Sequence, residues 1–180
     1  MKSKIIITVF IAFLMMTSVI GMIWSYNSVQ DNNSEAFQYG DYEFQKTDGR
    51  YVLELNGNQY VFDSTPYELS GIDIENFNLE SDKYYIIFNP DEKDLNLEYS
   101  IQKLYLVLKS LNVNIQLACS VEEGCDSNLP IKMCNDHAFY FRKSDSTRIY
   151  KDNKCVVVEG DNQGLSNGVD KINLMLLKII

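Results

Sequence analysis

The pattern of apolar and polar positions separates the first thirty residues from the rest of the chain. Residues 5–24 form a run of 20 residues without a charged side chain, preceded by Lys2 and Lys4. A helix of that length, about 30 Å, spans the hydrocarbon of a bilayer, so residues 1–26 are predicted to be a transmembrane anchor. A cleaved signal peptide is the alternative, although Val19-Ile20-Gly21 is a poor cleavage site.

Short alternating segments follow a polar stretch. Residues 27–36 are rich in Asn and Ser and predict a stalk, which leaves 37–180 as the folded domain. Between Tyr42 and Phe62, alternating segments are separated by an Asp-Gly and an Asn-Gly dipeptide. These dipeptides supply the positive φ angles of tight hairpin turns, so the segment predicts a three-stranded antiparallel meander.

A different pattern begins near residue 84. The continuous apolar run 84–88 predicts a strand covered on both faces, and apolar residues at helical spacing predict a helix over 95–111. Residues 113–119 then alternate as a further strand. A strand, a helix and a strand in close succession predict a right-handed crossover with the two strands parallel.

The last third of the chain continues this pattern. Strands are predicted at 138–141, 147–150 and 155–158, and apolar residues at helical spacing from Leu165 to Ile180 predict a final helix. The expected fold class is therefore α/β (α+β), with an N-terminal transmembrane helix, an antiparallel β-meander and then a mixed sheet covered by two helices.

Charge predicts the orientation of the chain and its partners. Because Lys2 and Lys4 precede the apolar run and the first charges after it are acidic, we expect a single-pass cell-membrane protein with its N-terminus inside and its domain outside, or secreted if the segment is cleaved. The chain after residue 30 carries 14 basic and 25 acidic residues, a formal charge of −11. Such a surface repels nucleic acid, so we expect no nucleic-acid partner and instead a protein partner at the cell surface.

Four cysteines lie in the exported part, at Cys119, Cys125, Cys134 and Cys155. An even number of cysteines in an oxidising compartment predicts two disulfides. Cys125 and Cys134 bracket a short loop and the other two lie at edges of predicted strands, so the preferred pairing is 125 with 134 and 119 with 155. Other pairings, such as 119 with 134, stay open because sequence does not fix the distances that a bridge requires.

A metal or thiol site is the alternative use of these cysteines. Cys134 and His137, the sole histidine, are three residues apart, and Cys119 and Cys125 could complete a tetrahedral zinc set. The paired Cys-x-x-Cys spacing typical of zinc sites is absent, as are Gly-x-Ser-x-Gly and His-Glu-x-x-His. We therefore expect no cofactor and a non-enzymatic binding or assembly module, the alternative being a thiol- or zinc-dependent enzyme that uses this cluster.

Two polar turns fall where α/β proteins bind ligands. Asp91-Glu92-Lys93-Asp94 follows the first parallel strand and could hold a cation, and the segment 160–168 places three glycines between a strand and a helix. The second segment matches neither a P-loop nor Gly-x-Gly-x-x-Gly. Capping of a helix N-terminus is the preferred interpretation of both turns.

An apolar amino-terminal helix followed by LACSVEEGCDSNLPIKMC and CVVVEGDNQGLSNGVDKINLMLLKII resembles a group of uncharacterised archaeal membrane-anchored small α/β proteins. Members share a Cys-rich loop with Leu-Pro-Ile, an Asn-x-Cys or Asn-Cys strand, a Gly turn and an Asp-containing terminal helix. The matching positions are Cys119, Cys125, Leu129, Pro130, Ile131, Cys134, Cys155, Gly160 and Asp170. The resemblance covers about a third of the chain and implies no activity.

Overall fold

The structure, a computed structural model, describes residues 35–180. The predicted membrane segment and nearly all of the predicted stalk lie outside the described residues. Within residues 35–180, no helix has both the length and the apolar character needed to cross a membrane.

The described chain begins with a four-stranded antiparallel sheet. Its strands pair in chain order: β1 (Ala36–Tyr39), β2 (Tyr42–Thr47), β3 (Arg50–Leu55) and β4 (Asn58–Phe62). The predicted meander is confirmed, and β1 adds a strand that the pattern did not predict. Asp48 and Asn56 have φ angles of 52° and 53°, which is the left-handed conformation that such hairpin turns require.

A mixed five-stranded sheet follows the meander. Its strands are β5 (Lys83–Phe88), β6 (Asn114–Cys119), β7 (Ala138–Lys143), β8 (Arg148–Asp152) and β9 (Cys155–Gly160). The spatial order is β6-β5-β7-β9-β8, with β8 antiparallel to β9 and every other pair parallel. The predicted parallel pair β5 and β6 is confirmed, whereas β7 and β8 are separated by β9.

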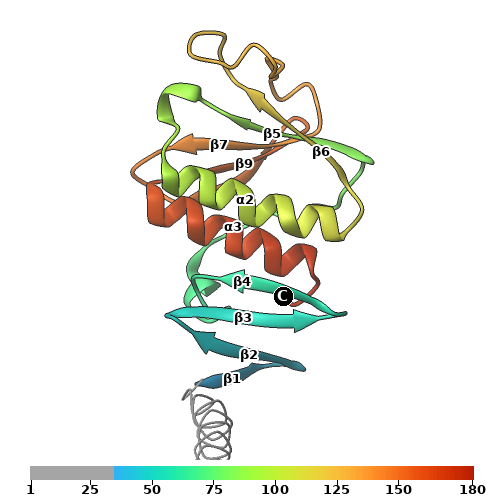
Figure 1. The fold of residues 1–180 in the computed structure, drawn as a ribbon, viewed down its shortest axis with the longest axis vertical. Helices are drawn as coiled ribbons and strands as arrows, with labels where there is room; N and C mark the ends of the chain where they lie inside the picture. The colour runs from blue at the N-terminus through green and yellow to red at the C-terminus, as the bar shows by residue number, and fades with distance from the viewer. Residues whose placement is uncertain (1–34) are drawn as a thin grey trace, which may run out of the picture. The chain divides into compact units, whose positions relative to one another are not determined.

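Two helices cover one face of this sheet (Figure 1). They are α2 (Leu95–Ser110) and α3 (Asn162–Leu176), with 3-10 turns at η1 (Glu68–Gly71) and η2 (Pro90–Glu92). The side chains packed between sheet and helices are Ile86, Phe88, Phe139, Phe141, Val156, Val158, Leu97, Leu104, Leu108, Leu165, Val169 and Ile172. The prediction of a mixed sheet covered by two helices is therefore confirmed.

Both helices begin at acidic caps. The Asp94 carboxylate accepts the backbone N–H of Leu97 at 2.8 Å, and the Asp161 carboxylate accepts that of Gly164 at 2.7 Å. These bonds satisfy N–H groups that have no partner within the helix. The capping interpretation of the two polar turns is confirmed.

The meander packs against the same pair of helices. In Figure 1, β4 lies nearest to the helices and β1 farthest from them. The contact is apolar and joins Phe44, Leu53, Tyr60 and Phe62 of the meander to Leu69, Val107, Leu174, Leu177 and Ile179. Two sheets thus share one helical layer, which fixes the position of the end of β4 relative to α2 and α3.

Candidate functional site

The two disulfides join Cys119 to Cys125 and Cys134 to Cys155, with Cα–Cα distances of 6.0 and 5.0 Å. The preferred pairing from the sequence was therefore wrong. Because β5 and β7 lie between β6 and β9, a cysteine on β6 is separated from Cys155 by three strand spacings, about 14 Å, which no disulfide spans. Cys125 instead returns to Cys119 through a tight turn in which Gly124 has a φ of 72°.

The zinc set suggested by the sequence is not assembled. All four sulfurs are bonded to one another, whereas zinc requires thiolates. His137 lies beside Tyr84, with ring centroids 5.5 Å apart. Across residues 35–180, no group of three or more His, Cys, Asp or Glu side chains could hold a metal ion.

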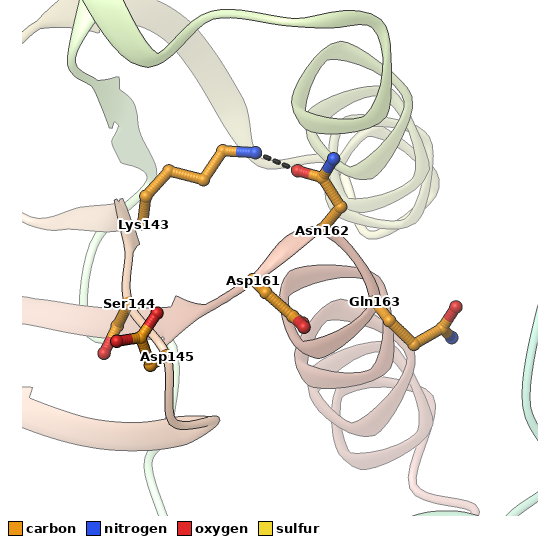
Figure 2. Close-up of a pocket in the computed structure, with 6 residues that line it drawn as sticks. All are labelled: Lys143, Ser144, Asp145, Asp161, Asn162 and Gln163. Atoms are coloured by element: carbon orange, nitrogen blue, oxygen red, sulfur yellow. Dashed lines mark hydrogen bonds between the residues drawn. The ribbon is translucent and has the colours of Figure 1, made fainter.

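A polar pocket of about 890 Å³ lies at the carboxyl edge of the sheet, between the ends of β7 and β9 and the start of α3. The residues that line it are all polar or charged, and they are Lys143, Ser144, Asp145, Asp161, Asn162 and Gln163 (Figure 2). This is the edge at which parallel α/β sheets commonly bind ligands.

Two of the charged residues of this pocket, Lys143 and Asp161, already have partners within the protein. The Lys143 ammonium lies 2.8 Å from the Asp94 carboxylate and also donates to the side chain of Asn162. The hydrogen bond from Lys143, together with that from the Leu97 N–H, lowers the pKa of Asp94. Asp161 is engaged as a helix cap. The pocket therefore has room for a small polar molecule but pairs no nucleophile with a base.

Among residues 35–180, no helix covers the second face of the mixed sheet. Ile87, Ala118, Ala138, Cys155 and Val157 are buried there beneath partly buried Tyr85, Tyr140, Tyr150 and Cys134. Parallel sheets in α/β proteins are usually covered on both faces. We call this surface, formed by Tyr85, Tyr140, Tyr150 and the charged residues among them, the tyrosine face.

Cations surround the rings of the tyrosine face. Lys83 and Lys132 lie 4.7 and 4.6 Å from the centroid of Tyr85, and Arg142 lies 5.9 Å from that of Tyr140. The hydrogen bond from Lys83 and the nearby charges lower the pKa of the Tyr85 hydroxyl. Surfaces that combine Tyr and Arg are typical of protein-binding hot spots.

Glu159 organises the arginines of this face. In the strand register, Glu159 of β9 lies opposite Arg142 of β7 on one side and Arg148 of β8 on the other. Its carboxylate is 3.1 and 2.7 Å from the guanidinium groups of these two arginines. The hydroxyl of Tyr150 donates to the same carboxylate at 2.8 Å. Burial opposes ionisation, but the hydrogen bonds from Tyr150 and Arg148 outweigh it, so the pKa of Glu159 is lowered.

A second charged cluster, which we call the internal cluster, lies inside the molecule, where the end of β4 meets the two helices. Lys103 of α2 donates to Asp170 of α3 at 2.6 Å, to Asp63 at 2.7 Å and to the hydroxyl of Ser166 at 2.9 Å. The side chains of Lys103 and Asp170 are 5% and 0% exposed. Arg50, 3.7 Å from Asp63, is the second cation of the cluster, so its two positive and two negative charges balance.

The carboxylate of Asp170 is held on both sides. While Oδ1 accepts from Lys103, Oδ2 accepts the backbone N–H groups of Asp63 at 2.7 Å and Ser64 at 3.1 Å. Burial raises the pKa of Asp170 to about 6 against these favourable contacts. The pKa of Asp63 is lowered, because hydrogen bonds from Lys103 and Ser166 outweigh the effect of its burial.

Sequence reasoning named Asp170 only through a resemblance and did not name Lys103 or Asp63. One feature of the sequence nevertheless indicated that Lys103 is paired with a buried acid. Lys103 stands one residue before Leu104, on a helix whose apolar positions spread over a broad face, and a lysine at the border of such a face often reaches a buried acid. The partners of Lys103 lie 40 and 67 residues away, so the sequence alone could not identify them.

No protein-family model, curated protein or solved structure was found to match this chain. The resemblance to archaeal membrane-anchored proteins stays a prediction.

Proposed function

We propose that this protein is a membrane-anchored, extracytoplasmic, disulfide-stabilised binding module without enzymatic activity, and that its tyrosine face binds a protein partner at the cell surface. The observation that carries the proposal is the mixed sheet with one face covered by helices and the other by Tyr85, Tyr140 and Tyr150 among four cations. Aromatic and arginine side chains over a buried apolar layer give a partner both area and polar contacts.

The two disulfides support the compartment in this proposal. They account for every cysteine of the chain, and structural disulfides persist in oxidising compartments and not in a reducing cytosol. The alternative of a thiol- or zinc-dependent enzyme needs free thiolates from Cys119, Cys125 or Cys134, and oxidised cysteines cannot supply them.

The compartment is tested by labelling lysines on cells that carry the full chain. A membrane-impermeant amine reagent should label the domain equally in intact and lysed cells, with Lys83 of the tyrosine face among the labelled sites. Labelling that appears only after lysis would place the domain in the cytoplasm and refute the extracytoplasmic part of the proposal. An intracellular protein, labelled only after lysis, is the control.

The binding surface is tested by photo-crosslinking. A photoreactive residue replaces Tyr140 in one variant and Glu54, exposed on the meander, in a matched control. We expect a discrete covalent protein adduct from position 140, reduced at least tenfold by Lys83→Ser with Lys132→Ser, which leave the Glu159 pairs intact, and none from position 54. Equal adducts from both positions, or none from position 140, would contradict binding at the tyrosine face.

A further inference from the structure

We propose that Lys103 and Asp170 condense spontaneously in the folded protein to form an intramolecular amide bond that links α2 covalently to α3. The proposal goes beyond the proposed function and does not depend on it. It starts from the internal cluster. There the Lys103 amine lies 2.6 Å from the Asp170 carboxylate, and the two side chains are 5% and 0% exposed.

The geometry brings the nucleophile to the carbon that it must attack. Since Nζ of Lys103 lies 2.6 Å from Oδ1 of Asp170, and a carbon–oxygen bond is about 1.2 Å long, the carboxyl carbon is within about 4 Å of the nitrogen. Held amines and acyl groups react far faster than the same groups free in solution, because the entropy of bringing them together has already been lost on folding.

The backbone supplies the stabilisation that an acyl-transfer intermediate needs. Oδ2 of Asp170 accepts two N–H groups, from Asp63 at 2.7 Å and from Ser64 at 3.1 Å. Two backbone donors on one oxygen form an oxyanion hole, and the negative charge of a tetrahedral intermediate would develop on this oxygen.

Asp63 is placed to carry the proton. Its Oδ2 lies 2.7 Å from the Lys103 nitrogen and accepts the Ser166 hydroxyl at 2.6 Å. In the reaction, the lysine ammonium gives one proton to Oδ1 of Asp170, which makes the carboxyl group neutral, and the free amine attacks the Asp170 carbon. As the new N–C bond forms, Asp63 takes a second proton from the nitrogen and passes it to Oδ1, so that the C–Oδ1 bond breaks and Oδ1 leaves as water. Asp63 returns to its carboxylate form, so amine and acid yield one amide and one water without another reactant.

The product satisfies every polar group of the cluster. The amide N–H would donate to Asp63, and the amide oxygen would keep the two backbone donors that Oδ2 has now. Condensation also removes two buried charges, whose desolvation opposes folding. Water is excluded from the bond by the burial of both side chains, which protects the bond from hydrolysis.

Peptide mapping of the purified full chain, reduced and digested with trypsin, tests the bond. Trypsin does not cleave after an acylated lysine, so a linked protein yields residues 94–109 joined to 155–171, at about 18 Da less than the sum of the two peptides, the mass of the water that condensation releases. An unlinked protein yields 94–103, 104–109 and 155–171 as separate peptides, and that result for the wild-type chain overturns the proposal.

Two variants separate this bond from other losses of water. Lys103→Arg keeps a positive charge but has no amine to acylate, and Asp63→Asn keeps the backbone donors but cannot take the proton. We expect no linked peptide from Lys103→Arg. From Asp63→Asn we expect at least tenfold less linked peptide than from the wild-type chain. A loss of about 18 Da that persists in Lys103→Arg would indicate a cyclic imide at an aspartate and would overturn the proposal. The wild-type map gives its answer even if a variant fails to fold.

Discussion

Glu159 and Asp170 are the two acidic side chains that the fold buries almost completely within residues 35–180, at 4% and 0% exposed. Each is neutralised by cations from other elements, because a buried carboxylate without partners would cost several kcal/mol. Their settings differ in one respect. The arginines that pair with Glu159 are themselves half-exposed, whereas the lysine that pairs with Asp170 is buried with it. Glu159 therefore organises a surface, and Asp170 joins elements inside the molecule.

The contribution of Glu159 to the free energy of unfolding can be measured, because it depends on pH. We expect Glu159→Gln to lower the free energy of unfolding at pH 7 by about 1–3 kcal/mol, since charge-assisted hydrogen bonds are lost. The folded-state pKa is lowered below the ordinary value of 4.5, so this stabilisation is present above pH 4.5 and is lost as the pH falls through the lowered pKa.

Urea unfolding of both proteins between pH 3 and pH 7 checks this prediction, and the difference between them should shrink below pH 4.5. Glu98→Gln is the matched control, because Glu98 pairs with Lys93 at 3.0 Å in an exposed pair. Exposed pairs contribute about 0–1 kcal/mol. A Glu159→Gln effect no larger than that of Glu98→Gln would contradict the role of Glu159.

At the scale of elements, the position of α3 depends on how closely it can approach the sheet. Gly168 faces β9, and a Cβ atom at this position would lie 2.8 Å from Cγ1 of Val158. The helix starts at the Asp161 cap and ends near Leu176, which places Asp170 opposite Lys103. Close contact between α3 and β9 is thus a condition for the internal cluster.

We expect Gly168→Ala to destabilise the protein by about 1–3 kcal/mol, because the added methyl group overpacks the contact between helix and sheet. Gly71→Ala is the matched control. A Cβ atom at Gly71 meets no atom within 4 Å, so this change should stay within about 0.5 kcal/mol. Thermal unfolding of both variants checks the difference, and equal effects would show that α3 does not depend on close packing at Gly168.

At the scale of the whole molecule, two sheets share one pair of helices, and two disulfides add covalent bonds to the mixed sheet, one at the end of β6 and one at the start of β9. The Cys134–Cys155 bridge closes a sequence separation of 21 residues and joins the loop before β7 to β9. The Cys119–Cys125 bridge, which starts at the last residue of β6, closes a sequence separation of only 6 residues. A longer closed loop removes more conformational freedom from the unfolded chain.

The two bridges should therefore contribute unequally to stability. We expect replacement of Cys134 and Cys155 by alanine to cost about 3 kcal/mol, and replacement of Cys119 and Cys125 about 2 kcal/mol. Denaturant unfolding of the two double variants, each with its remaining bridge intact, measures the difference. A larger loss from the shorter bridge would contradict the loop-closure argument for these sites.

The sequence alone determined those features that depend on residues near one another in the chain. Asp-Gly and Asn-Gly turns gave the meander, helical spacing gave α2 and α3, and acidic residues before each helix gave the caps, because these are local consequences of backbone geometry and periodicity. Strand order, the cysteine pairs and the cluster of Lys103, Asp63 and Asp170 were decided only by tertiary structure. Their partners lie on strands and helices far apart in the chain, and no local pattern records which of these elements pack together.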